Sequence, residues 1–105
     1  MLKFKEKMGS VYLMDEKDEA IYEVTEPAVL FDKVTFTVHK VGNKDVVQKY
    51  FDECIEKCKR AGSDLYESWL LMDLPKDAEI MDKLLNNSGY MERFLKQNGI
   101  ELLEV

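Results

Sequence analysis

His39 is the side chain in this sequence that is best suited to acid–base chemistry. It is the only histidine, and an imidazole normally changes its charge near neutral pH. Catalysis would also need an orienting carboxylate and a nucleophile, and no sequence motif supplies either group. His39 alternates with apolar neighbours, on the same side of a predicted strand as Thr35 and Thr37. We therefore interpret it as a surface residue of that strand.

The two cysteines, Cys54 and Cys58, lie four residues apart and share the apolar face of a predicted helix. A zinc site would need two further ligands, and His39 precedes the helix. Free cysteines of this kind behave as small hydrophobes. We predict that both thiols pack in the core, and the sequence predicts no metal ion and no cofactor.

The acidic residues are numerous, but their spacing is not that of a catalytic pair. Asp and Glu number 21 against 15 Lys and Arg, which gives a net charge of −6. Asp52, Glu53 and Glu56 lie opposite the apolar stripe of their predicted helix. A second group falls in the first turns of the next helix, where the helix dipole favours acids: Asp77, Glu79 and Asp82. The acidic run from Asp15 to Glu19 also lacks the ordered ligand pattern of a calcium loop. We predict no catalytic residues and a protein that is not an enzyme.

The charge and the apolar runs limit the classes of partner. Phosphate binding depends on clustered Lys and Arg, whereas this chain is acidic and has only two arginines, Arg60 and Arg93. The sequence therefore argues against direct binding of nucleic acid. No apolar run has the length of a membrane span or of a secretory signal. The expectation is a cytoplasmic protein without a membrane segment.

The first third of the chain has the composition of strands. Leu2 and Phe4 alternate with three lysines, as in an edge strand, and a turn is expected at Gly9-Ser10. The runs 11–14 and 20–25 predict a hairpin around the acidic tip. Pro27 ends the second of these strands, and the apolar run 28–31 is interpreted as a buried connection or a short extra strand.

The stretch from 34 to 61 changes its apolar period from that of a strand to that of a helix. Val34, Phe36 and Val38 alternate with polar residues, which predicts a half-buried strand over 34–41. The following apolar residues keep helical spacing and predict a helix over 44–61. Asn43 is its expected N-cap, and Gly62 suits the position just past its end.

The last third is predicted to be mainly helical. The segment 65–72 is interpreted as a helix capped by Ser63, with a strand through 69–72 as the alternative. A further helical stripe runs from Ala78 to Leu95. It is expected to break at the polar residues 86–89, with Ser88 capping the second helix, although one kinked helix would also fit. Residues 100–105 are predicted to form a short terminal strand.

These elements predict one α+β domain spanning residues 1–105. Its N-terminal half would be an antiparallel β-meander of about four strands, followed by a helical C-terminal half and a short terminal strand. A ferredoxin-like arrangement is the alternative if residues 65–72 are extended.

The function that this sequence favours is a small, non-enzymatic protein-interaction module. Such an accessory, regulatory or inhibitory subunit would dock on a protein partner, one with basic groups since the chain is acidic. A homo-oligomer is left open. The expected partner-binding residues are acids of the predicted hairpin tip and aromatic residues, which are common at interfaces: Asp15, Glu16, Asp18, Glu19, Tyr22, Tyr66 and Trp69.

Two other functions remain open from the sequence. One is a small-molecule-binding or enzymatic domain with a pocket between sheet and helices, which fold class alone does not exclude. The weaker one is mimicry of nucleic-acid charge, which would require the acids to gather on one face. Here lysines are interspersed among them.

Overall fold

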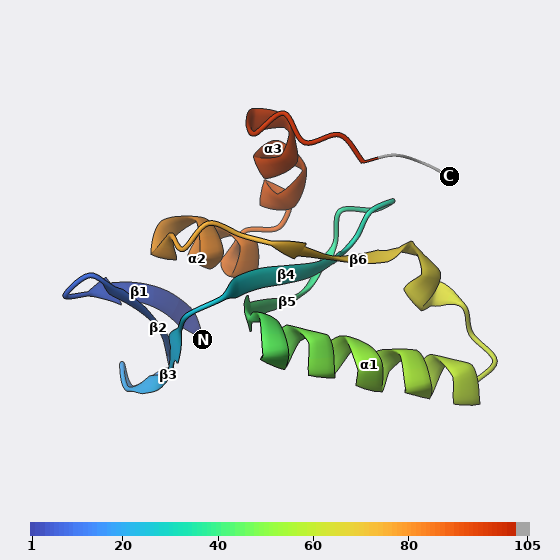
Figure 1. Ribbon diagram of the computed structural model, residues 1–105, viewed down its shortest axis with the longest axis horizontal. Coiled ribbons are helices and arrows are strands. Elements are labelled where there is room, and N and C mark those ends of the chain that lie inside the picture. The colour runs from blue at the N-terminus through green and yellow to red at the C-terminus, as the bar shows by residue number, and fades with distance from the viewer. Residues whose placement is uncertain (103–105) are drawn as a thin grey trace.

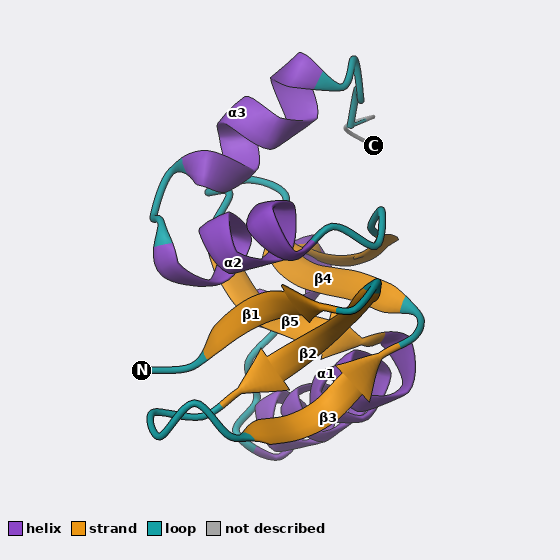
Figure 2. Ribbon diagram, turned by 90° about the vertical axis from the view of Figure 1, so that its left-hand side faces the viewer, coloured by secondary structure: helices purple, strands orange, loops and turns teal. Residues whose placement is uncertain are grey.

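The chain folds into two three-stranded antiparallel sheets, with helices packed around the second of them (Figures 1 and 2). The computed structural model describes residues 1–102. The first sheet has the order β1-β2-β3 and comprises β1 (Lys3–Lys7), β2 (Ser10–Met14) and β3 (Ala20–Val24). The second has the order β5-β4-β6 and comprises β4 (Pro27–Asp32), β5 (Val38–Asn43) and β6 (Trp69–Asp73). The helical elements are α1 (Lys44–Arg60), the 3₁₀ turn η1 (Leu65–Ser68), α2 (Ala78–Asn86) and α3 (Tyr90–Gln97). The α+β class predicted from the sequence is thus confirmed. The predicted meander of about four strands is wrong, because five N-terminal strands divide between two sheets and a sixth, β6, lies among the helices.

Strand β4 is the centre of the molecule because both of its faces are buried. Val29 and Phe31 point into the main core, which α2, α3 and the first sheet complete. Ala28 and Leu30 point the other way, toward Val47 of α1. These four side chains of β4 are all 0% exposed. The sequence allowed residues 28–31 to be either a buried connection or a short extra strand. They are part of the central strand of the second sheet.

The N-terminal strands follow the sequence prediction closely. β1 is an edge strand, and β2 and β3 form the predicted hairpin around residues 15–19. The open edge of β1 is covered by α2: the Phe4 N–H donates to Asp82 Oδ1 at 3.0 Å, and Asn86 Nδ2 donates to the Leu2 carbonyl at 3.1 Å. These side chains satisfy an edge that could otherwise pair with another chain. The turn between β1 and β2 centres on Met8 and Gly9, which both have positive φ. It lies one residue earlier than the predicted turn at Gly9-Ser10.

The predicted strand over 34–41 is wrong in its first half. Residues 33–37 form a turn, and β5 begins only at Val38. The Asp32 carboxylate explains the difference, since its Oδ1 accepts hydrogen bonds from the Val34 N–H at 2.8 Å and the Thr35 N–H at 3.2 Å. This local bonding competes with strand pairing. As a result Val34 is 68% exposed, and Phe36 has a φ of 61° rather than an extended conformation.

Helix α1 has the predicted bounds, but it is less buried than expected. Val47 is its one fully enclosed residue, while Cys54 and Cys58 are half-buried free thiols. The prediction that both cysteines are core residues is therefore wrong in degree. They do lie on the inward face. However, α1 is a single helix lying across the sheet. Its own Tyr50 and Phe51 are only partly buried, as are Trp69 and Leu71 of β6.

Asn43 occupies the predicted N-cap position, but its side chain joins the two sheets instead of capping α1. Its Oδ1 accepts from the backbone N–H groups of Thr25 and Glu26 at 2.8 and 3.2 Å. Its Nδ2 donates to the Glu23 carbonyl at 3.0 Å. The amide thereby fixes the connection between β3 and β4 to the end of β5.

The helix predicted over 65–72 is wrong, and the alternative strand is the better description. Only the short turn η1 precedes β6, which pairs antiparallel to β4 and places Leu71 opposite Leu30. Burial of these side chains against β4 outweighs the local helical spacing. The ferredoxin-like alternative does not follow, because the strands divide into two separate antiparallel sheets.

The break between two C-terminal helices is confirmed, although the predicted cap is not. Asp77 caps α2 through hydrogen bonds from Glu79 N–H and Ile80 N–H. The cap of α3 is Gly89, with a φ of 86°, and Ser88 makes no capping bond. This left-handed residue interrupts the otherwise continuous stripe. Residues 100–102 form no strand, and the rest of the predicted terminal strand, 103–105, lies outside the described residues.

The core assignment predicts very different costs for two phenylalanines. Phe31→Ala should lower the free energy of unfolding by about 3–5 kcal/mol, because it empties a fully enclosed site. Phe36→Ala should cost only about 1 kcal/mol, since that ring is partly exposed in a turn. Urea unfolding of both variants measures the difference. Equal losses would contradict the placement of Phe36 outside the main core.

Candidate functional site

The seven predicted partner-binding residues do not form one site. The acidic loop 15–19 lies at one end of the molecule and η1 at the other, along the longest dimension of 44 Å (Figure 1). Tyr22 belongs to β3 of the first sheet, whereas Tyr66 and Trp69 belong to η1 and the start of β6. The acidic and the aromatic candidates must therefore be considered separately.

Much of the charge on the acidic loop is compensated within the molecule. Asp18 lies 2.9 Å from Lys3 Nζ and 3.6 Å from Lys5 Nζ. The hydrogen bond from Lys3, with the charges of both lysines, lowers the pKa of the Asp18 carboxyl. Glu16 lies 2.8 Å from the Met1 α-amino group. Asp15 Oδ1 accepts from the Lys17 and Glu19 N–H groups, both at 2.9 Å, which holds the loop in shape.

Tyr22 lies against the backbone of β5 rather than projecting into solvent. Its hydroxyl is buried next to Gly42, and a Cβ at position 42 would overlap it. The hydroxyl has no hydrogen-bond partner of good geometry, although the Asn43 N–H is close. Burial raises the pKa of this phenol. Tyr22 thus serves the contact between the two sheets.

Trp69 lies in a half-exposed group of rings, two of which belong to α1. Its indole stacks on the His39 imidazole, with centroids 4.0 Å apart and planes at 30°, and its centroid is 6.3 Å from that of Phe51. Lys40 Nζ sits 5.4 Å from the centre of the Tyr50 ring. We call these four rings, of His39, Tyr50, Phe51 and Trp69, the Trp69 face. It lies on the side of the second sheet that α1 covers incompletely.

A bulge in β5 brings His39 to this face. The β4–β5 register shifts between Leu30, which pairs with Lys40, and Phe31, which pairs with Val38, so His39 has no partner residue on β4. The alternation of 34–41 predicted an ordinary surface position and missed this contact. His39 Nε2 is buried without a hydrogen-bond partner. Burial lowers the pKa of the imidazole, and the nearby Asp32 carboxylate only partly opposes this shift.

Asp32 is a residue with site-like bonding that the sequence did not indicate: its carboxylate accepts three hydrogen bonds. Its Oδ1 holds the 33–37 turn, and its Oδ2 accepts from the Ser68 hydroxyl at 3.0 Å. Burial would raise the pKa of the carboxyl, but the hydrogen bonds from Val34, Thr35 and Ser68 together lower it. An Asp at the start of a turn is the sequence signal that could have identified it.

Asp32, His39 and Ser68 are the three residue types of a hydrolytic triad, but their bonding differs from one. The Ser68 hydroxyl is within hydrogen-bond distance of Asp32 and of the Leu65 carbonyl. A nucleophilic serine would instead donate to the imidazole, with the carboxylate on the other side of the ring. In the arrangement seen here, Asp32 and Ser68 connect two loops.

The part of the chain that the structure describes offers neither a metal site nor a membrane-spanning helix. Within residues 1–102, no group of three or more His, Cys, Asp or Glu side chains is arranged to hold a metal ion. No helix in the same range has the length and apolar character needed to cross a bilayer. Comparison with protein-family models, with curated proteins and with solved structures finds no match for this chain.

The environment of His39 predicts a loss of stability in mild acid. The folded state favours the neutral imidazole, whereas an unfolded histidine takes up a proton near pH 6.5. The free energy of unfolding should therefore be highest above about pH 6.5 and fall as the pH drops toward 5. Urea unfolding at several pH values measures this slope. His39→Gln should flatten it, and an unchanged slope in that variant would contradict the assignment.

The contact between Tyr22 and Gly42 predicts a coupled pair of substitutions. Gly42→Ala should destabilise the protein by about 1–3 kcal/mol, because its methyl group overlaps the phenol oxygen. Tyr22→Phe alone should be nearly neutral, since the lost hydroxyl has no good partner. In the double variant most of the Gly42→Ala loss should disappear, because the nearest remaining ring atom is 3.5 Å from the new Cβ. Additive effects in a double-mutant cycle would contradict this contact.

Proposed function

We propose that the protein is a small, non-enzymatic interaction module that docks on a protein partner through the Trp69 face and the adjoining η1 turn. The observation that carries this proposal is the incomplete cover of the second sheet by α1. The lone tryptophan of the chain is thereby left half exposed among other rings. Partly exposed Trp and Tyr side chains are the residues that most often anchor protein interfaces.

The η1 turn supports the same surface. Leu65 is 68% exposed and Tyr66 is half-buried, immediately before Trp69. An exposed leucine alone is ordinary, but one that adjoins a group of rings extends an apolar surface. A protein partner would bury Leu65 together with the edge of the tryptophan.

The charges around η1 favour a partner with basic groups. Asp64 and Glu67 flank Leu65 and Tyr66, and within residues 1–102 neither carboxylate forms an ion pair. By contrast, Asp18 of the acidic loop is already paired with lysines. The proposal therefore places the docking surface at η1 and the Trp69 face, with the acidic loop contributing to long-range steering.

Leu65→Asp should abolish binding to the partner while leaving stability within about 0.5 kcal/mol, because the side chain is largely exposed. Affinity capture from an extract of the native host, with the purified wild-type chain as bait, identifies retained proteins by mass spectrometry. Met8→Asp is the matched control, since Met8 is also an exposed apolar residue but lies in the β1–β2 turn, at the end of the molecule opposite η1 (Figure 1).

The charge contribution is tested with the double variant Asp64→Asn and Glu67→Gln. It should slow association with the captured protein more than it speeds dissociation, and the difference from wild type should shrink as salt is added. Retention of the same proteins by the Leu65→Asp and Met8→Asp variants would reject the Trp69 face as the docking surface.

A further inference from the structure

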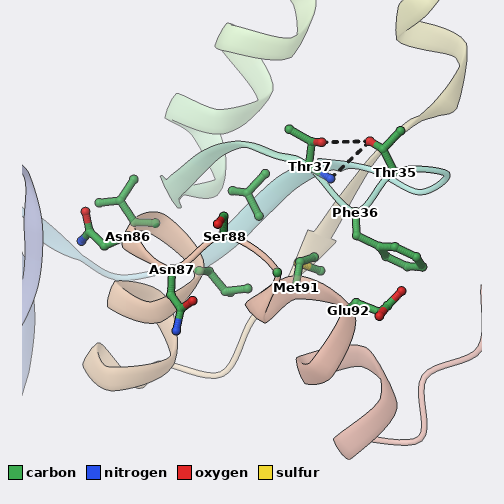
Figure 3. Close-up of a pocket in the computed structure, with 12 residues that line it drawn as sticks. Thr35, Phe36, Thr37, Asn86, Asn87, Ser88, Met91 and Glu92 are labelled. Atoms are coloured by element: carbon green, nitrogen blue, oxygen red, sulfur yellow. Dashed lines mark hydrogen bonds between the residues drawn. The ribbon is translucent and has the colours of Figure 1, made fainter.

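A second surface has the form of a small-molecule pocket, and the residues that line it are far in sequence from the η1 turn. The 33–37 turn and the start of β5 form one wall, and the end of α2, the 87–89 break and the first turn of α3 form the other (Figure 3). Its volume is about 550 Å³. Ligand pockets of proteins commonly have about 300–1,000 Å³, so the space would hold a compact organic molecule.

The base of the pocket is apolar and belongs to the main core. Leu84 and Met91 line it and are 2% and 1% exposed. Val38 and Leu85 are partly buried lining residues that pack against the same core. A ligand with an aliphatic or aromatic body would therefore remove apolar surface from water on binding.

The two ends of the pocket differ in chemistry. Figure 3 shows Asn86, Asn87 and Ser88 at one end, and Phe36 with Glu92 at the other. Within residues 1–102, the side-chain carboxamide of Asn87 and the hydroxyl of Ser88 make no hydrogen bond, whereas the Asn87 backbone N–H donates to the Lys83 carbonyl. They can thus donate to, or accept from, a carboxamide or hydroxyl group.

Within residues 1–102, Glu92 is the one charged residue that lines the pocket, and no lysine, arginine or histidine joins it. Its one ion pair in the same range is with Lys96 at 3.6 Å, a surface pair with the i,i+4 spacing. Such pairs contribute little stability, so a ligand cation could displace Lys96. The charge of the lining therefore favours a cationic ligand and disfavours an anionic one.

Phe36 supplies the second feature that suits a cation. Its φ of 61° is unusual for a bulky residue, and residues held in such conformations cluster at functional sites. The conformation is imposed by Asp32: its carbonyl accepts from the Phe36 N–H at 2.7 Å, and its carboxylate fixes the two residues before. The aromatic ring is thereby kept at the Glu92 end, where its face can attract a cation.

We propose that this pocket binds a small amphipathic amine, with its ammonium group at Glu92 and Phe36, its apolar body on Leu84 and Met91, and a carboxamide or hydroxyl at Asn87 and Ser88. The site is separate from the docking surface proposed above, and its test does not depend on any protein partner.

The proposal is tested with leucinamide, which carries an ammonium, an aliphatic side chain and a carboxamide. Titration of the ¹⁵N-labelled protein, followed by amide chemical shifts, should show saturable changes confined to residues 35–38 and 84–92. N-acetyl-leucinamide, the neutral analogue, should bind about tenfold more weakly. N-acetyl-leucine, which is anionic, should produce no saturable change.

Substitutions assign the cation to its partners. Glu92→Gln should raise the Kd for leucinamide about tenfold, which corresponds to about 1.4 kcal/mol. Glu79→Gln is the matched control, because Glu79 forms an equivalent i,i+4 pair with Lys83 but does not line the pocket; its Kd should equal that of wild type. Phe36→Leu should weaken binding about two- to fivefold.

Three results would overturn the proposal. The first is the absence of saturable shifts with leucinamide at millimolar concentration. The second is equal binding of the cationic, neutral and anionic compounds. The third is an unchanged Kd in the Glu92→Gln variant. None of these results bears on capture of a protein by the Trp69 face, so the two proposals fail independently.

Discussion

The burial of β4 on both faces is the constraint on which the rest of the structure depends. Val29 and Phe31 need a packed layer on one side of the strand, and Ala28 and Leu30 need one on the other. A chain of 105 residues must therefore provide two layers. The first sheet with α2 and α3 completes one layer, whereas a single helix, α1, is left for the other. The half-exposed rings of the Trp69 face follow from this unequal division.

The sequence predicted elements well where local and tertiary preferences agree. The β2–β3 hairpin, α1 and the division between α2 and α3 all carry clear apolar patterning, and their packing demands the same conformation. The segment 65–72 failed because helical spacing and β-pairing compete there, and only the neighbouring β4 decides between them. A short apolar run seen in isolation cannot reveal that neighbour.

The candidate sites were predicted less well because they depend on contacts distant in sequence. The aromatic character of Tyr66 and Trp69 was enough to suggest them as interface residues. The stacking of His39 on Trp69, however, requires a bulge in β5 that no local sequence pattern predicts. The pocket was foreseen only as a space between sheet and helices. Its walls come from residues 35–38 and 84–92, and the turn that forms one of them was interpreted as strand.

Asp32 reaches both surfaces through its two carboxylate oxygens. Oδ1 fixes the turn that carries Phe36, and Oδ2 accepts from Ser68, the residue before Trp69. A rotation of this one side chain would disturb both loops together. Thermodynamic coupling between two sites is reciprocal. Occupants of the two surfaces would therefore change each other's affinity by the same factor if both bind more tightly to one rotamer of Asp32.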